Sequence, residues 1–483
     1  MAYRRYKDLN VPKLRNTLFV LTMFKQIYLT IQRTSLPSWR ALSAVLSALV
    51  VLISTSVNAQ GLIRDAEIES FLRDLGNPIF EAAGLLPEDV HIYIVGDDSL
   101  NAFVAGGQNM FLHTGLMKKV DTPEQLAGVM AHETGHISGG HLARLPDAMS
   151  GATAAMILTY ILGAAAMVAG EGDAGMAILA GGQTIGQRTI LAFSRGQESA
   201  ADQAGLGFLE SADVTGIGLV EFMETLADQE ALSARRQDPY VRTHPLSYQR
   251  VASMRNRVED SPTKDKLLGA DFDKRLRRAQ AKLVGFLDAP GAVFRKYPSR
   301  DTSIEARYAH AVAYHRQGLL EQALQTIDYL LLQEPENPYF HELKGQILFE
   351  SGKAEASIKP HRKAVTLAPD QLLLKVNLAQ SLVAVEDEEF DEEAKEILTA
   401  VLAKDKDYSS AWHQLAIVQE RRGESGLASL ASAERYALLG AMPYAINQAR
   451  RAQSLLPHGS AGWLRSADIL AEAEAAIRAQ KRR

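Results

Sequence analysis

A short histidine-containing run constrains this chain more than any other feature. His132 and His136 are four residues apart, within a stretch from 123 to 144 that is predicted to be helical. Successive residues of a helix turn by about 100°, so the two imidazoles lie on one face and can bind the same ion. Glu133 directly follows His132 on the helix, so its carboxylate can contact a water bound to that ion without itself ligating the ion. The run predicts a metal site, although an alanine-flanked helix can carry these three residues by chance.

A second run, downstream, offers the remaining ligand of such a site. Catalytic zinc usually has three protein ligands, because its fourth position holds water. Glu198 and Asp202 are again four residues apart, in a run that reads as helix to residue 210. Glu198 can ligate the metal, while Asp202 can accept a hydrogen bond from the outer ring nitrogen of a ligand histidine. A solvated helix face is the usual reading of such a pair, but the small residues 199–201 favour a closely packed helix.

With these residues in place, the chain resembles the gluzincin peptidases, which are related to the CAAX prenyl proteases and the heat-shock membrane protease. The residues that carry the resemblance are His132, Glu133, His136 and the run Glu198-x-x-Ala201-Asp202. The resemblance implies one Zn²⁺ per chain, with His132, His136 and Glu198 as its ligands. It also implies that Glu133 is the general base and that Asp202 orients a ligand or donates a proton. The implied enzyme is a zinc metalloendopeptidase.

A histidine before a proline is the next candidate. Pro245 holds His244 in an extended conformation and starts a helix with Ser247 and Arg250 in its first turns. Members of the family carry a similar His-Pro close to the metal. The sequence leaves two roles open for His244: a donor to the oxyanion of the tetrahedral intermediate, or a ligand that occupies the open zinc position and holds the enzyme idle. Arg250 is expected to pair with an acid of the site.

His141 follows the first motif closely and is predicted not to be a ligand. On a continuous helix it points about 140° away from His136 and about 180° away from His132. Gly139 and Gly140 weaken this geometry, because they can end the helix before His141.

Upstream of the motif the sequence predicts a small sheet. Residues 91–95 read as one strand, and residues 101–104 and 108–114 as a pair joined by a glycine turn. In the family, the strand nearest the metal is a sheet edge that holds an extended substrate. The resemblance places residues 101–103 on that path, whereas the residue pattern alone shows only a strand.

The N-terminal region reads as a secretory signal. Basic residues precede an apolar run, 41–53, that is too short to span a bilayer, and small residues lead to a cleavage site after Ala59. Met23 is an alternative start. The chain has no cysteine, which excludes disulfides and a lipid-modified cysteine. The formal charge of −5, without a basic-aromatic cluster, excludes a nucleic-acid surface. The expected location is the periplasm.

The apolar stretch 148–193 lies between the two motifs. It is predicted to form buried or interfacial helices rather than membrane crossings, because its longest apolar run is short for a span and ends in a Gly-Glu-Gly-Asp sequence. One hypothesis is that it covers the cleft or makes peripheral contact with a membrane or an apolar client. Packing within the molecule is the favoured alternative.

The C-terminal part reads as helical repeats. Gly318 and Gly352 are 34 residues apart, as are Pro335 and Pro369, and 34 residues is the period of tetratricopeptide helix pairs. The third unit is irregular, with the acidic residues 386–391 inserted near its turn. Such pairs stack into a solenoid with a concave binding surface, and a plain helical bundle is the alternative.

The predicted architecture is mainly α, of the α+β type. It consists of a signal peptide at 1–59, a gluzincin-type metalloprotease domain with a small β-sheet at 60–262, a helical linker at 263–302 and an α-solenoid of tetratricopeptide repeats at 303–480. This order resembles the family of periplasmic beta-barrel assembly-enhancing proteases of Gram-negative bacteria.

The resemblance also implies a biological role. The expected clients are unfolded or misassembled outer-membrane proteins, which the enzyme degrades and whose assembly it assists. The repeats are expected to contact the barrel assembly machinery. Two alternatives stay open: a periplasmic chaperone or scaffold with a latent protease site, and a zinc hydrolase of non-peptide substrates. The intact Glu133 favours the enzyme, because a scaffold has no use for a base beside the metal.

Overall fold

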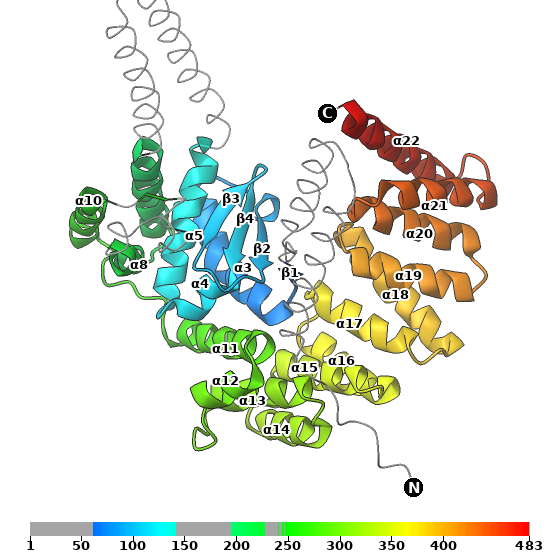
Figure 1. Cartoon of the computed structure of the whole chain (residues 1–483), viewed down its shortest axis with the longest axis horizontal. Helices are drawn as coiled ribbons and strands as arrows, with labels where there is room; N and C mark the ends of the chain where they lie inside the picture. Colours follow the sequence, from blue (N-terminus) through cyan, green and yellow to red (C-terminus); the bar gives the residue numbers. More distant parts are fainter. Residues whose placement is uncertain (1–60, 142–194, 228–239, 241–243, 246, 483) are drawn as a thin grey trace, which may run out of the picture. The chain divides into compact units, whose positions relative to one another are not determined.

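The computed structural model describes residues 61–141, 195–227, 240, 244–245 and 247–482 (Figure 1). The predicted signal peptide and the apolar stretch 148–193 lie outside these residues. So do residues 142–144 of the first predicted helix and residues 228–236, where the sequence after Asp202 also reads as helix. The predictions for those segments therefore stay predictions. In the part of the chain that the structure describes, no helix is both long enough and apolar enough to cross a membrane.

A four-stranded sheet forms the β part of the first domain. Its strands are β1 (Leu62–Ile63), β2 (His91–Val95), β3 (Ala102–Ala105) and β4 (Asn109–His113), in the spatial order β1-β2-β4-β3. β1 is antiparallel to β2, β2 is parallel to β4, and β3 is antiparallel to β4. The three strands predicted upstream of the motif are confirmed to within one residue, β3 is an edge strand, and β1 was not predicted.

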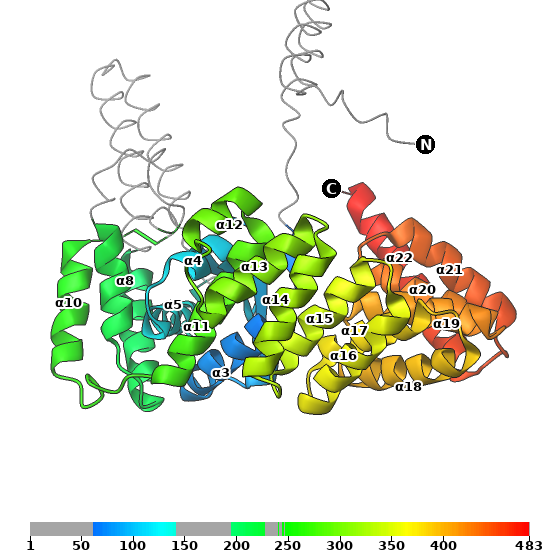
Figure 2. The same ribbon diagram turned by 90° about the horizontal axis from the view of Figure 1, so that it is seen from below.

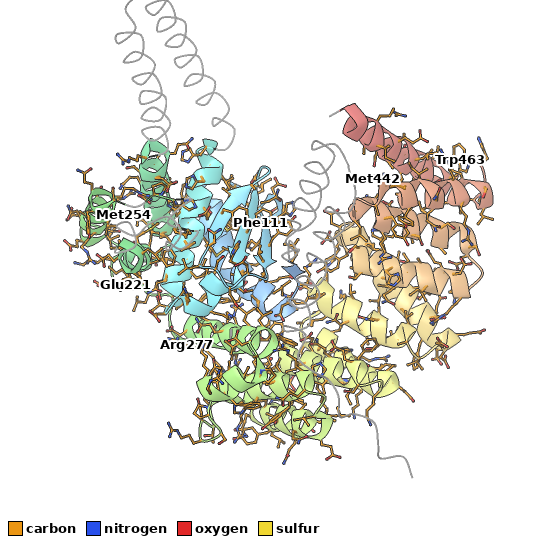
Figure 3. The ribbon with its side chains drawn as sticks, in the orientation of Figure 1. Phe111, Glu221, Met254, Arg277, Met442 and Trp463 are labelled. Atoms are coloured by element: carbon orange, nitrogen blue, oxygen red, sulfur yellow. The ribbon has the colours of Figure 1, made fainter. Side chains whose placement is uncertain are left out.

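The two faces of this sheet differ. Ile94, Met110 and Leu112 are buried on one face, in a core shared with the helices of this domain. On the other face lies Phe111, which Figure 3 labels on the sheet. Its ring stacks between Tyr93 and Phe103, with centroid distances of 5.0 and 4.9 Å. This alternation is the period-2 pattern of a strand that buries one side.

In the described residues of the first domain, helices are the other regular elements. They are α3 (Ala66–Ala82), η1 (Pro87–Asp89, a 3₁₀ helix), α4 (Thr114–Lys119), α5 (Pro123–Ser138), a helix over residues 195–211, α8 (Ile217–Ala227) and α10 (Tyr248–Glu259). α5 starts where predicted: Thr122 accepts a hydrogen bond from the Gln125 N–H, and Pro123 lies in the first turn. α5 packs against α3, α8 and β3, and all its residues from Pro123 to His136 are buried. A helix that is buried on all sides needs small and apolar residues, which explains its composition.

Helices α11 to α22 follow one another in sequence order (Figure 2). Their bounds are α11 (Ala270–Leu287), α12 (Pro290–Lys296), α13 (Ile304–Arg316), α14 (Leu320–Gln333), α15 (Pro338–Glu350), α16 (Ala354–Leu367), α17 (Leu372–Val383), α18 (Glu388–Lys404), α19 (Ser409–Arg421), α20 (Ser425–Leu438), α21 (Met442–Leu455) and α22 (Ala461–Arg482). From α13 onward, each helix packs against the next, as the repeat prediction requires. The segment from 288 to 300, which lies within the predicted helical linker at 263–302, contains α12, which Pro290 starts.

The turns inside the first helix pairs keep a strict spacing. Gly318 and Gly352 adopt φ of 71° and 75°, and Glu386, another 34 residues on, adopts φ of 62° in the same position. This conformation is unusual for a residue with a side chain. Gly423 comes 37 residues after Glu386, because α18 has 17 residues where α14 and α16 have 14. The irregularity of the third unit is therefore a longer helix after the turn, not an insertion at it.

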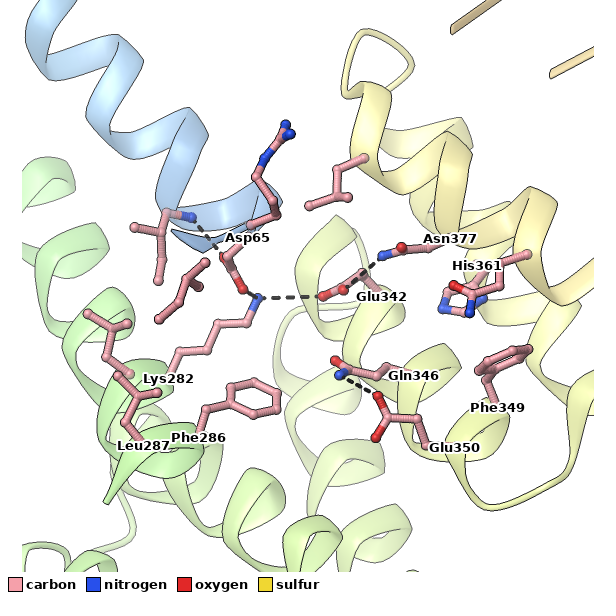
Figure 4. A pocket seen from close by; sticks show the side chains of 16 residues that line it. Asp65, Lys282, Phe286, Leu287, Glu342, Gln346, Phe349, Glu350, His361 and Asn377 are labelled. Atoms are coloured by element: carbon pink, nitrogen blue, oxygen red, sulfur yellow. Dashed lines mark hydrogen bonds and ion pairs between the residues drawn. The ribbon is translucent and has the colours of Figure 1, made fainter. Parts of the chain in front are cut away.

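The first domain and the repeats meet around a buried lysine. Lys282 Nζ of α11 lies 2.8 Å from Asp65 Oδ2 and 3.5 Å from an oxygen of Glu342 (Figure 4). It also lies 3.5 Å from an oxygen of Glu67. Tyr308 of α13 donates a hydrogen bond of 2.6 Å to Glu67. This group, hereafter the Lys282 cluster, borders a cavity of about 480 Å³. It ties residues at the start of α3 to the repeat helices α13 and α15.

Candidate metal centre

The two helices that carry the predicted ligands cross at small residues. A Cβ on Gly135 of α5 would lie 2.7 Å from the carbonyl oxygen of Ala201, on the helix over 195–211. A Cβ on Gly205 of that helix would lie 2.9 Å from the carbonyl oxygen of Ala131. Neither position has room for a side chain, so the two backbones touch. This close approach lets ligands on both helices reach one ion.

The three predicted ligands converge at this crossing. The Nε2 atoms of His132 and His136 are 3.1 Å apart. Glu198 places Oε2 3.4 Å from the His132 Nε2 and Oε1 3.5 Å from the His136 Nε2. Ligand atoms of these residues and of His244 all lie within 4.8 Å of one another, and all four residues are buried.

This donor set fits Zn²⁺, which takes imidazole nitrogen and carboxylate oxygen as ligands. For the protein side chains alone, burial lowers the pKa of His132, but the Asp202 and Glu198 carboxylates outweigh it and raise that pKa to about 10. Burial, followed by His132, lowers the pKa of His136 to about 2. These pKa values favour a protonated His132 beside a neutral His136 imidazole and the Glu198 carboxylate. The positive charge of His132 lies at the place where the metal would bind.

An acid and an arginine hold the outer side of this site. Asp202 Oδ1 lies 3.0 Å from His132 Nδ1, the ring nitrogen that faces away from the ligand group. Arg250 donates to both oxygens of Asp202, through Nε at 2.7 Å and Nη2 at 2.8 Å. Its Nη1 lies 3.2 Å from Glu198 Oε2 and donates to the Pro245 carbonyl at 2.6 Å. Burial acts to raise the pKa of Asp202, but Arg250 and His132 outweigh it and lower that pKa.

The outer nitrogen of His136 has a different partner. Its Nδ1 lies 2.9 Å from the Nδ1 of His141, and the two rings meet edge to face with centroids 4.9 Å apart. α5 ends at Ser138, and Gly140 has a φ of 60°, so the regular helix is interrupted before His141, whose ring contacts that of His136. The sequence prediction that His141 is not a ligand agrees with this position, since its ring faces His136 from outside.

Glu133 is fully buried beside the ligands. Its side chain is 0 % exposed, and no group in the described residues forms a hydrogen bond with either carboxylate oxygen. The Nε2 of His244 is 3.4 Å from Oε1. Burial raises the pKa of Glu133, while His244 and His132 act to lower it. A buried carboxyl without a hydrogen bond is costly, and it has the proton affinity that a general base needs.

His244 enters the ligand group itself. Its Nδ1 lies 3.2 Å from both oxygens of Glu198 and 3.3 Å from the His132 Nε2. The fully buried ring of Tyr240 stacks on the His244 ring at 4.6 Å. The backbone N–H of His244 donates to the Tyr240 carbonyl at 2.8 Å, and the backbone N–H of Tyr240 donates to the Leu100 carbonyl at 3.2 Å. These bonds hold His244 beside the chain that leads into the edge strand β3.

The structure thus brings together every residue that the sequence singled out for the site. These residues are His132, Glu133, His136, Glu198, Asp202, His244 and Arg250. Their individual roles stay predictions. Sequence reasoning missed the contacts of His141 and Tyr240. The glycine pair before His141 was the signal for the first, and the i, i+4 spacing of Tyr240 and His244 was the signal for the second.

A buried His-Glu-x-x-His helix with a carboxylate from a second helix defines a zinc metallopeptidase. Residues 64–258 match the model described as Peptidase family M48. The "Beta-barrel assembly-enhancing protease" of Escherichia coli K12 is 28% identical over 412 residues, which are 83% of this chain and 81% of that protein. A "Putative beta-barrel assembly-enhancing protease" of Vibrio cholerae is 26% identical over 290 residues, 59% of each chain.

Two further comparisons cover parts of the chain. "Metalloprotease YcaL" of Escherichia coli K12 is 29% identical over 175 residues, which are 36% of this chain and 63% of that protein. Among solved structures, the tetratricopeptide protein YrrB is similar with a TM-score of 0.31 at 13% identity, over 36% of this chain and 91% of that one. The match to Peptidase family M48 covers residues of the first domain.

Proposed function

We propose that this chain is a periplasmic zinc endopeptidase that degrades unfolded or misassembled outer-membrane β-barrel proteins and assists their assembly. The observation that carries the hydrolytic part is the buried Glu133 beside His132, His136 and Glu198. The names of the relatives, which span most of the chain, support the client class. The repeat helices support a function that holds a protein client or contacts the barrel assembly machinery.

The proposed mechanism assigns each side chain one task. His132, His136 and Glu198 would hold Zn²⁺, which when bound polarises a water and the scissile carbonyl. Glu133 accepts the proton of the attacking water and returns it to the nitrogen of the leaving amine. Asp202 keeps the His132 ring turned so that Nε2 faces the ligand group, and Arg250 fixes Asp202.

Removal of the base tests the hydrolytic part. In the variant Glu133→Gln, cleavage of an unfolded model protein should fall by about 10²–10⁴-fold, because the amide cannot accept the proton. Zinc content should be unchanged, since Glu133 is not among the proposed ligands. Glu88→Gln, at an exposed glutamate of η1, is the matched control and should retain full activity. Equal activity of Glu133→Gln and wild type at equal zinc content would exclude this role.

Client preference is tested separately with the full mature chain. A denatured outer-membrane barrel protein and a denatured soluble protein of similar length are offered together, and the disappearance of each is followed. We expect the barrel protein to be cleaved faster. Equal cleavage rates for the two proteins would indicate a peptidase that does not prefer outer-membrane barrel proteins. The periplasmic location predicts a mature protein that begins at residue 60, which N-terminal sequencing of the exported protein checks.

A latent site is the second candidate function, and the position of His244 favours it. The His244 Nδ1 lies as close to Glu198 as the proposed ligands do. A histidine that binds the metal there would take the position of the water. We therefore expect His244→Ala to increase cleavage of the unfolded model protein. A decrease in cleavage at unchanged zinc content would instead support the role of His244 as an oxyanion donor. If the protein is only a chaperone, neither wild type nor His244→Ala should cleave the model protein.

The remaining proposals concern the arrangement of the chain. We keep the division into a signal peptide at 1–59, a metalloprotease domain at 60–262, a helical linker at 263–302 and repeats at 303–480. Support for a packed linker comes from Gln280 of α11, which donates to the carbonyls of Met117 and Val120 in the first domain. The apolar stretch 148–193 is still proposed to make peripheral membrane contact or to cover the cleft.

A further inference from the structure

His136 has two ring nitrogens, and each faces a different neighbour. Nε2 faces the ligand group, 3.1 Å from the His132 Nε2 and 3.5 Å from Glu198. Nδ1 faces His141, at 2.9 Å from its Nδ1. For Nε2 to bind a metal its lone pair must be free, so the hydrogen of the neutral ring must be on Nδ1.

We infer that His141 is a positioning residue that fixes the tautomer of His136 and thereby raises the zinc affinity of the site. With the hydrogen of His136 on Nδ1, the Nδ1 of His141 accepts it, and the hydrogen of His141 is then on its own Nε2. Metal-bound histidines are usually fixed by a carboxylate, a carbonyl or a water. Here the neutral imidazole of His141 fixes the His136 ring, whereas the carboxylate of Asp202 fixes the His132 ring.

The backbone around His141 is built to keep its ring in this place. A Cβ on Gly139 would lie 2.5 Å from the His141 Nε2, so the ring packs against a position that only glycine can occupy. The His141 carbonyl accepts a hydrogen bond of 3.2 Å from the side chain of Gln197, which is adjacent to Glu198. The segment after α5 is thus bonded to the helix that carries the carboxylate ligand. His141 is 7% exposed, so this contact is shielded from water.

The test is zinc affinity, measured on the full mature chain by competition with a chelator. His141→Leu removes the acceptor and should weaken zinc binding by about 10- to 100-fold, which is the usual effect of losing such a partner. His141→Asn keeps an acceptor, since its Oδ1 takes the place of Nδ1, and should remain within a few-fold of wild type. His91→Leu, at an exposed strand histidine, is the matched control and should not change the affinity.

Two outcomes would overturn the inference: wild-type affinity in His141→Leu, or an equally weak site in His141→Asn and His141→Leu. If His141→Leu does not fold, His141→Asn still decides, because loss of affinity there contradicts the acceptor role. The inference rests on His136 being a ligand, as proposed above. His136→Leu separates the two: unchanged zinc affinity in that variant would remove the ligand assignment itself. A ¹⁵N spectrum of the zinc-loaded protein adds an independent readout, in which the hydrogen of His136 should be found on Nδ1.

Discussion

His132 is the residue on which the charges of the site converge. It is fully buried, with Asp202 on one ring nitrogen and Glu198 near the other. Burial alone would lower its pKa, yet the two carboxylates raise it to about 10. At neutral pH, without metal, the ring therefore carries a proton that a metal must displace. Zinc binding and proton release are linked at this one side chain.

This linkage predicts the pH dependence of zinc affinity. Below a pKa of about 10 the folded protein holds one proton on His132, so the apparent affinity should fall about tenfold for each unit by which the pH decreases. Calorimetric titrations with zinc at pH 7, in buffers of different ionisation enthalpy, should show the release of about one proton from the protein. Affinity that does not change between pH 6 and 8 would contradict the assignment.

At the residue scale, the sequence predicts contacts between side chains on one helix better than contacts that form across a turn. The spacing of four residues placed His132 above His136, and Glu198 above Asp202, without reference to the fold. The contact between His141 and His136 depends instead on where α5 ends. That end is set by Gly139 and Gly140, whose backbone angles the sequence allows but does not determine. The sequence likewise did not predict the stacking of Tyr240 on His244.

Among the elements, the crossing of α5 with the helix over 195–211 determines whether the site can form. A Cβ on Gly205 would lie 2.9 Å from the Ala131 carbonyl oxygen and 3.0 Å from the His132 nitrogen. Alanine is favoured over glycine inside a helix by about 1 kcal/mol, so helix propensity alone predicts that Gly205→Ala is stabilising. The contact predicts the opposite sign.

We expect Gly205→Ala to destabilise the protein by about 1–3 kcal/mol, because it overpacks a tight contact, and to weaken zinc binding as the ligands separate. Urea unfolding and chelator competition measure the two effects. Gly196→Ala lies on the same helix, with nothing within 4 Å of its Cβ, and should leave both unchanged. An increase in stability for Gly205→Ala would mean that the helices can move apart at no cost.

Element types were predicted better than their contacts. The small residues between the acids suggested a closely packed helix, yet only Ala201 of the three is buried, and Ser199 and Ala200 are exposed. The face that packs follows the spacing of Ala201 and Gly205, four residues apart, which composition alone does not specify. The repeat turn at Glu386 was likewise obscured, because a glutamate occupies a position where its counterparts have glycine.

For the whole molecule, the Lys282 cluster is the connection whose loss should be most damaging. Lys282 is 1% exposed and lies near three carboxylates, those of Asp65, Glu67 and Glu342. Burial raises the pKa of Glu342 to about 7, with Lys282 acting to lower it. Removal of the ammonium would leave buried carboxylates without a cation, which typically costs about 3–5 kcal/mol.

Lys282→Met should therefore lower the urea midpoint of unfolding and make the first domain and the repeats unfold in separate steps. Lys353→Met, at an exposed lysine before α16, is the control and should behave as wild type. Tryptophan fluorescence follows the repeats and zinc release follows the metal centre. Coincident transitions in Lys282→Met would show that other contacts suffice to join the two parts.

The period of 34 residues predicted the repeats, because each unit repeats its own local pattern. It carried no information about the Lys282 cluster, whose members Asp65 and Glu342 are far apart in the chain and share no pattern. Long-range pairs of this kind follow from the packing of α3 on the repeat helices, which only the folded structure shows.

The order of the site residues along the chain has a consequence for biosynthesis. A ribosome releases the chain from its N-terminus, so α5 emerges with both histidines and Glu133 well before Glu198. Arg250, which secures Asp202 and thereby the His132 ring, emerges later still. A nascent polypeptide thus contains the general base long before it can bind zinc in the finished geometry. The complete set of proposed ligands and their supporting contacts can therefore form only after Arg250 has been synthesised.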